Sequence, residues 1–128
     1  MKNLPQISQA EYEIMKIIWD SSPISTNEVC ERVPKSHNWS SKTVHTLLSR
    51  LTAKQVITYE KRGRMFYYSP LISQEDYISQ ERHQFLNRFY NGRASSLVSS
   101  LISDAELSDE DLQKMYELID SKLNNSEH

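Results

Sequence analysis

The chain has 128 residues, enough to bury one core or a small domain with an appendage, and its formal net charge is −2. Its one cysteine, Cys30, excludes an intrachain disulfide framework and a cysteine-cluster metal site, and we expect it to be a small core residue. The longest apolar run is too short to span a bilayer and the first residues lack a signal-peptide core, which predicts a cytoplasmic protein with no membrane insertion.

The two halves of the chain differ in charge. Residues 1–70 hold ten Lys and Arg against six Asp and Glu, a net charge of +4, whereas residues 71–128 hold five against eleven, a net charge of −6. The first half can attract a polyanion, and the second half would be repelled by one. The pattern therefore predicts nucleic-acid contact in the first half and a different task in the second.

Five serines mark the expected starts of helices. Ser8, Ser25, Ser73 and Ser108 are each followed three residues later by Glu or Asp, which is the capping-box pattern or its aspartate variant. Ser40 follows the same plan, although a threonine stands where the acid would be. Each serine also lies between two apolar residues at the hydrophobic-staple positions and precedes an apolar-periodic run, so two signals predict each start.

In chain order, the first part of the chain is predicted to hold three helices and a hairpin. The helices cover about residues 8–21, 26–33 and 40–54, and a proline follows closely after each of the first two. Two strands, 57–61 and 65–69, are rich in Tyr, Phe and Ile and flank a turn that contains glycine. This order is typical of a winged helix-turn-helix domain, which we assign to residues 1–71 of a mainly α protein.

One side of the third helix is predicted to be buried and the other to face DNA. Four apolar residues at i, i+3, i+4 and i+7 form a single stripe: Val44, Leu47, Leu48 and Leu51. The opposite side has hydrogen-bonding side chains, two cations and no carboxylate, whereas a helix that is merely solvated usually mixes both signs. The residues expected at the DNA are Lys42, Thr43, His45 and Thr46, near base edges, and Arg50, near phosphate.

The tip of the predicted hairpin is basic. Lys61, Arg62 and Arg64 surround Gly63, which permits a tight turn. Such a cluster is usually only a charged turn, but behind a helix of this kind it would reach the neighbouring phosphates or the minor groove. We therefore predict that these three cations bind DNA. Of the two tyrosines on the second strand, Tyr67 and Tyr68, one is expected in the core and the other near the DNA backbone.

Residues 72–128 are predicted to be all helical and to dimerise. The expected helices cover about residues 73–90 and 108–123, with a further helical segment between them after Asn91-Gly92. These helices are too few for an independent core, and each has an apolar face, so the economical reading is that they pack against a second copy of the chain. The residues expected in that interface are Phe85, Phe89, Leu97, Leu101, Leu112, Met115, Tyr116 and Ile119.

Three segments carry a resemblance to a known family. Residues 39–44 with Arg50-Leu51, and residues 7–15 with Ile18-Trp19, resemble the BlaI/MecI penicillinase repressors, and residues 85–92 resemble the BlaI branch in particular. The resemblance implies a winged-helix DNA-binding domain and a helical dimerisation domain. It further implies a homodimer, without cofactor, that binds double-stranded inverted-repeat operators with TACA/TGTA cores. Such dimers repress β-lactamase or related antibiotic-resistance genes.

The chain departs from the family pattern at two places. The family usually has a proline after the cap serine, where this chain has Ser41, and the change loses some preorganisation but no contact. Family repressors are inactivated when a membrane sensor-transducer metalloprotease triggers cleavage of an Asn-Phe bond, and the matching bond here is Ser100-Leu101. Either the protease accepts this pair, or a small effector releases the repressor. The cysteine cluster of the family's copper-responsive branch is absent.

Two alternatives to a DNA-binding regulator belong to other classes of protein. A winged-helix domain can serve protein contact without DNA, and a basic helix face can be a solvated surface. An enzyme is not indicated, since no nucleophile–base pair, carboxylate dyad or phosphate-binding loop is visible. The four histidines are scattered with no pair at ligand spacing, so no metal site is expected.

Overall fold

The computed structural model describes residues 3–104 and 107–125, and the chain divides into two compact units, Met1–Gln80 and Glu81–His128. The predicted boundary after residue 71 falls just before helix α4 (Gln74–Tyr90), whereas the first turns of that helix belong to the first unit. Within the described ranges, no helix is both long enough and apolar enough to cross a membrane.

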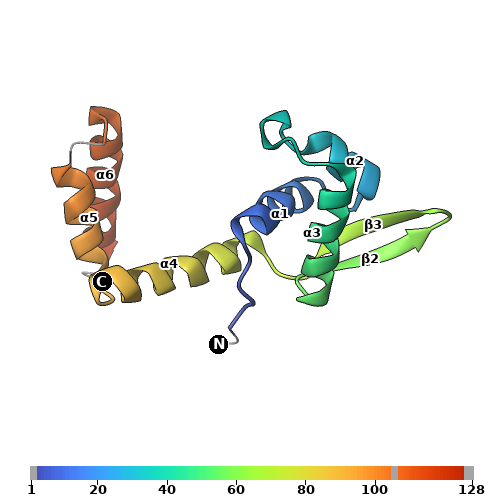
Figure 1. The fold of residues 1–128 in the computed structure, drawn as a ribbon. Coiled ribbons are helices and arrows are strands. Elements are labelled where there is room, and N and C mark those ends of the chain that lie inside the picture. The colour runs from blue at the N-terminus through green and yellow to red at the C-terminus, as the bar shows by residue number, and fades with distance from the viewer. Residues whose placement is uncertain (1–2, 105–106, 126–128) are drawn as a thin grey trace. The chain divides into compact units, whose positions relative to one another are not determined.

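The first unit is a winged helix, as predicted (Figure 1). Its sheet has three antiparallel strands in the order β1-β3-β2, and the β2–β3 hairpin extends beyond the helices as the wing. The predicted helices and strands are confirmed, with ends that shift by a residue or two. The elements before α4 are α1 (Gln9–Ser21), β1 (Ile24–Ser25), α2 (Thr26–Arg32), the short 3-10 helix η1 (Lys35–His37), α3 (Ser41–Ala53), β2 (Ile57–Arg62) and β3 (Met65–Pro70).

The predicted helix caps are confirmed by hydrogen bonds. Each of the five cap serines accepts the backbone N–H of the residue three positions later. At α1 the box is complete, because the Glu11 carboxylate also accepts the Ser8 N–H at 2.8 Å. At α3, where the acid is missing, the hydroxyls of Ser40 and Thr43 lie 3.1 Å apart. The start of α3 is therefore fixed by a cap without a carboxylate, which leaves this end of the helix free of negative side-chain charge.

The core of the first unit lies between α1, α2, α3 and the sheet. The whole predicted stripe of α3 is buried, from Val44 to Leu51, and it meets the buried side of α1. Burying each such side chain contributes roughly 1.5–3 kcal/mol. Cys30 is half-buried and packs against this core, as predicted, and Trp39 does the same. The fully buried apolar side chains are Ile14, Met15, Ile18, Ile24, Val29, Val44, Leu48, Leu51, Val56 and Ile57, and Leu47 is 4% exposed.

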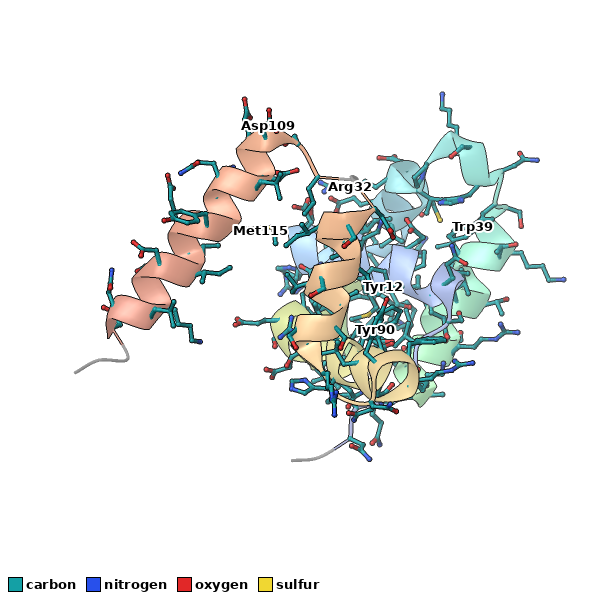
Figure 2. All side chains as sticks on the ribbon, turned by 90° about the vertical axis from the view of Figure 1, so that its left-hand side faces the viewer. Tyr12, Arg32, Trp39, Tyr90, Asp109 and Met115 are labelled. Atoms are coloured by element: carbon teal, nitrogen blue, oxygen red, sulfur yellow. The ribbon has the colours of Figure 1, made fainter. Side chains whose placement is uncertain are left out.

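The second unit consists of the remainder of α4 with α5 (Ala94–Ser103) and α6 (Asp109–Asn125). Asn91 and Gly92 both have positive φ and end α4 at the predicted place. Among the described residues of this unit, none of the large apolar side chains is buried. The side chains of α6 can be followed in Figure 2 from Asp109 past Met115. Apolar helices without a buried core need another surface to cover them.

Candidate nucleic-acid interface

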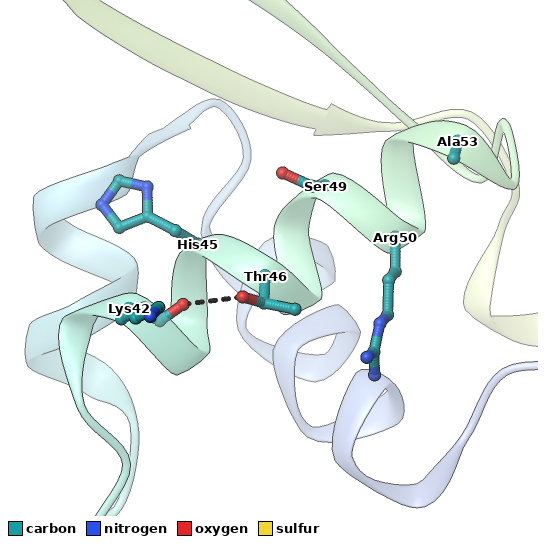
Figure 3. Close-up of a pocket in the computed structure, with 6 residues that line it drawn as sticks. All are labelled: Lys42, His45, Thr46, Ser49, Arg50 and Ala53. Atoms are coloured by element: carbon teal, nitrogen blue, oxygen red, sulfur yellow. Dashed lines mark hydrogen bonds between the residues drawn. The ribbon is translucent and has the colours of Figure 1, made fainter.

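The outer side of α3 presents the polar face that the sequence predicted. Figure 3 shows six side chains along this side, and together they line a shallow hollow. Because the apolar stripe of the same helix is buried in the core, the polar side is held outward by the fold. The hollow has no carboxylate in its lining, which consists of Lys42, His45, Thr46, Ser49, Arg50 and Ala53.

The polar side chains of α3 differ in how many of their hydrogen-bonding groups are already used within the helix. Thr46 donates its hydroxyl proton to the carbonyl of Lys42 at 3.0 Å, so only its lone pairs and its methyl group face outward. The hydroxyl of Thr43 lies beside the cap serine, and this side chain is half-buried. In the described part of the chain, Lys42, His45 and Arg50 form no side-chain hydrogen bond or ion pair. These three are the predicted residues best placed to meet a ligand.

The wing turns tightly at a two-residue loop. Arg62 and Met65 are the last paired residues, so Gly63 and Arg64 make the turn between β2 and β3. Gly63 has φ +63°, and a glycine at the first of the two positions is typical of a type II′ hairpin turn. A Cβ atom at Gly63 would meet open space, so the backbone conformation and not crowding calls for glycine.

Two of the three predicted wing cations lie over aromatic rings. The Lys61 ammonium lies 5.8 Å from the ring centre of Phe66, and the Arg62 guanidinium lies 5.1 Å from that of Tyr67. Tyr68 points the other way and packs against the core, as alternation along the strand predicts. Burial raises the pKa of the Tyr68 hydroxyl, although a hydrogen bond with Thr26 partly opposes this.

Glu60 is a residue of the wing that the sequence analysis missed. Its carboxylate lies 3.3 Å from the guanidinium of Arg62, and both side chains are exposed. The signal was present, because residues two apart on a strand share a face. An exposed pair of this kind contributes at most about 1 kcal/mol, so Arg62 can exchange Glu60 for another anion at little cost.

A buried ion pair holds the far end of α3. Glu11 on α1 is 2% exposed, and its carboxylate accepts the Lys54 ammonium at 2.6 Å, while Lys54 is the C-cap residue of α3. Burial alone would raise the pKa of Glu11, but the hydrogen bonds from Lys54 and Ser8 together lower that pKa below its usual value. The carboxylate is therefore charged at neutral pH, and it lies inside the domain rather than on the outer side of α3.

The residues predicted for dimerisation and cleavage lie in the second unit. Phe85, Phe89, Leu101, Leu112, Tyr116 and Ile119 are exposed, and Leu97 and Met115 are half-buried. The Ser100-Leu101 bond lies within α5, where the Ser100 carbonyl accepts the Asp104 N–H at 3.0 Å. The Ser100 hydroxyl donates to the Ser96 carbonyl at 3.1 Å. This bond is thus part of a regular helix.

Sequence comparisons give a family for the chain. The family model described as "Penicillinase repressor" matches residues 7–121. The penicillinase repressor of Bacillus licheniformis is 44% identical over 124 residues, which cover 97% of each chain. The methicillin resistance regulatory protein MecI of Staphylococcus aureus (strain N315) is 32% identical over 117 residues, which cover 91% of this chain and 95% of that one.

Solved structures agree with the winged-helix fold. The solution structure of the DNA-binding domain of the repressor BlaI has 49% sequence identity and a TM-score of 0.53, and the match covers 60% of this chain and 94% of that one. The monomeric form of Bacillus licheniformis BlaI, in complex with the blaP half-operator, matches with the same identity and coverage and a TM-score of 0.52. With its family match over most of its length, the chain belongs to the penicillinase repressor family, whose members are DNA-binding transcriptional repressors and not enzymes.

Proposed function

We propose that this repressor acts in the cytoplasm as a homodimer on inverted-repeat operators with TACA/TGTA-like cores, and that it blocks transcription of β-lactamase or related antibiotic-resistance genes. The observation that carries the proposal is the exposed, carboxylate-free side of α3 next to a basic wing. Support comes from the relative that was solved with a half-operator and is 49% identical over this region.

We infer the DNA contacts from the geometry of the first unit. The N-terminal half of α3 enters the major groove, where Lys42 and His45 reach base edges, and the methyl groups of Thr43 and Thr46 suit thymine. Arg50, farther along the helix, holds phosphate. The wing places Lys61, Arg62 and Arg64 on the adjacent backbone or minor groove, and Arg62 leaves Glu60 as it binds.

The second unit supplies the dimer contacts. Its apolar side chains are exposed, among them Phe89 at 58%, Tyr116 at 67% and Ile119 at 54%. A second copy of the same helices covers such faces most economically, because a closed two-fold interface uses one patch twice. The two recognition helices then meet successive major grooves about one helical turn apart.

Footprinting of the purified protein on the DNA upstream of its own gene tests the proposal directly. A protected inverted repeat with TACA/TGTA half-sites is the expected result. Binding that depends on salt but is indifferent to sequence would keep a basic DNA-binding face and remove the operator assignment.

Replacing Lys42 by alanine is expected to weaken binding and to flatten its dependence on salt. Besides reaching base edges, the Lys42 ammonium neutralises phosphate charge at the edge of the groove, so the slope of log K against log salt is expected to fall by about 0.9 for each half-site. Arg62→Ala is expected to do the same. The matched control is Lys122→Ala on α6, which removes one exposed cation from the other unit and leaves the slope unchanged. An unaltered slope in both α3 and wing variants would contradict these phosphate contacts.

The mode of release separates two mechanisms. In the first, a membrane sensor-transducer metalloprotease leads to cleavage of the Ser100-Leu101 bond in the second unit. In the second, a small effector bound at the dimer interface releases the operator without cleavage. The observation that favours the second is the presence of Ser-Leu, within a regular helix, in place of Asn-Phe.

Incubation of the dimer with an activated sensor protease distinguishes them, with mass spectrometry of the products as the measurement. Cleavage predicts two fragments that meet between residues 100 and 101. The control carries Asn and Phe at these positions (Ser100→Asn with Leu101→Phe). An intact parent chain beside a cleaved control would exclude release by proteolysis at this bond.

A further inference from the structure

The segment before α1 is tied to the start of α4. This segment, residues 3–7, is here called the N-terminal strap. The Leu4 N–H donates to the Gln80 side-chain oxygen at 2.6 Å, and the Gln80 side-chain nitrogen donates to the Leu4 carbonyl at 2.9 Å. One amide group thus occupies both backbone groups of Leu4, as a neighbouring strand would. One turn earlier on α4, the Tyr77 hydroxyl accepts the Ile7 N–H at 3.2 Å.

The same strap is also tied to the recognition helix. Lys54, the C-cap residue of α3, donates to the Gln6 carbonyl at 2.8 Å and to the buried carboxylate of Glu11 at 2.6 Å. The strap therefore contacts α3 through Lys54, and it contacts α4 through Tyr77 and Gln80. These contacts join segments that are far apart in the sequence and lie within the first unit.

The start of α4 is held at two points within the first unit. Tyr77 is 4% exposed, and its ring lies close to those of Tyr12 and Trp19. Trp19 also donates to the Ile72 carbonyl at 2.9 Å, just before the helix begins. Tyr12 and Trp19 both belong to α1, so this helix contacts the start of α4 around Tyr77. The rings of Tyr12 and Trp19 around Tyr77 hold α4 at one point. The hydrogen bonds between Gln80 and Leu4 hold it at a second point, one turn later.

We infer that the N-terminal strap sets the direction in which α4 leaves the DNA-binding unit, and that Gln80 is a positioning residue for the spacing between operator half-sites. The inference rests on the proposed dimer. In such a dimer the two recognition helices are joined through α4 of each subunit, so the direction of α4 relative to α3 determines which half-site spacing both can meet. The two hydrogen bonds between Gln80 and Leu4 narrow the range of directions that α4 can take. Operators with another half-site spacing are then bound more weakly.

The experiment compares three DNA duplexes with the full-length protein: a single half-site, the inverted repeat with its natural spacing, and the same repeat with two base pairs added between the half-sites. The variant is Gln80→Met, which keeps the length of the side chain and removes both hydrogen bonds to Leu4. Two lost hydrogen bonds lead us to expect that preference for natural over altered spacing falls by about tenfold. Half-site affinity is expected to stay within about twofold, because the DNA contacts are untouched.

The matched control is Gln74→Met, the same substitution at the exposed first residue of α4. It is expected to keep the spacing preference of the parent protein. Tyr77→Phe provides a second variant, since it keeps the buried ring and removes the hydroxyl that accepts Ile7, and it is expected to weaken the preference as well.

Two results would overturn the inference. A Gln80→Met protein with the parent's spacing preference shows that the hydrogen bonds between Gln80 and Leu4 do not orient α4. A parallel loss on the half-site and on both repeats shows that Gln80 only stabilises the DNA-binding unit. If the parent protein itself binds the repeat no better than a half-site, the proposed binding of a dimer to the operator is wrong. The inference is then also wrong, and this result differs from the two described above.

Discussion

Replacing Lys54 by methionine is expected to lower the free energy of unfolding by about 2–3 kcal/mol at neutral pH, as measured by urea denaturation. The substitution leaves the Glu11 carboxylate buried without its cation, and its second oxygen already has no hydrogen-bond partner among the described residues. Removing one partner of a fully buried pair costs about 3–5 kcal/mol, and the smaller figure reflects the partial exposure of Lys54, which lets water reach the site.

The pH dependence gives this expectation a definite sign. The folded-state pKa of Glu11 lies below its ordinary value of 4.5, so its contribution is present above that pH and is lost as the pH falls through the folded-state pKa. Without Lys54 the folded-state pKa of Glu11 rises, because burial is then opposed only by the hydrogen bonds with Ser8. The deficit of the variant should therefore shrink as the pH is lowered from 7 to about 4.

Two further proteins isolate the cause. The double variant Lys54→Met with Glu11→Gln removes the charge as well as its partner, and it should regain much of the lost stability. Lys16→Met breaks the 3.0 Å ion pair between the exposed Lys16 and the half-buried Glu13, and it should cost less than about 1 kcal/mol because the lysine is open to solvent. Equal losses of unfolding free energy in Lys16→Met and Lys54→Met would mean that burial of the Glu11 carboxylate adds nothing to the cost of losing its cation.

Replacing Ile119 by glutamate is expected to convert the proposed dimer to monomers and to lower affinity for a full operator by at least about a hundredfold. Ile119 is 54% exposed and shares one side of α6 with Leu112, Tyr116 and Leu123. A carboxylate placed in an apolar contact between two chains pays for desolvation without a partner. Linking two half-site contacts contributes an avidity of about 10²–10⁴, and this factor is lost with the dimer.

The matched control is Ser121→Glu, which adds the same charge to the same helix on the opposite side. It should remain dimeric in sedimentation equilibrium and should bind the full operator normally. Both proteins should bind a single half-site equally, since the DNA-binding unit is unchanged. An Ile119→Glu protein that sediments as the parent does would place the dimer contact elsewhere.

The features that could be predicted from the sequence depend on residues that are close together along the chain. A helix start depends on about four consecutive residues, so the cap serines and their partners could be identified from sequence, and the stripe from Val44 to Leu51 then indicated which side of α3 is buried. The turn at Gly63 was predictable for the same reason, because a two-residue hairpin needs a particular residue type.

The missed features depend on partners far along the chain. Strand β1 has two residues and exists because Ile24 and Ser25 pair with Tyr68 and Tyr67 of β3. Glu11 was read from sequence as the acid of a capping box, and nothing near it in sequence indicates that Lys54 lies 2.6 Å away. The pair of hydrogen bonds between Gln80 and Leu4 is likewise set by tertiary packing, and no pattern in either segment predicts it.

If the proposed dimer is released by cleavage of the Ser100-Leu101 bond, the helical state of that bond bears on the order of events during induction. With the Ser100 carbonyl bound to the Asp104 N–H, a protease can act only on the fraction of chains in which α5 has opened. Pairing with a second copy makes that opening rarer, so freshly synthesised single chains would be cut before repressor that already sits on DNA. Bound dimers would then leave the operators at their own rate of dissociation. The delay before induction would reflect this rate, because cleavage removes the newly made repressor that would otherwise rebind.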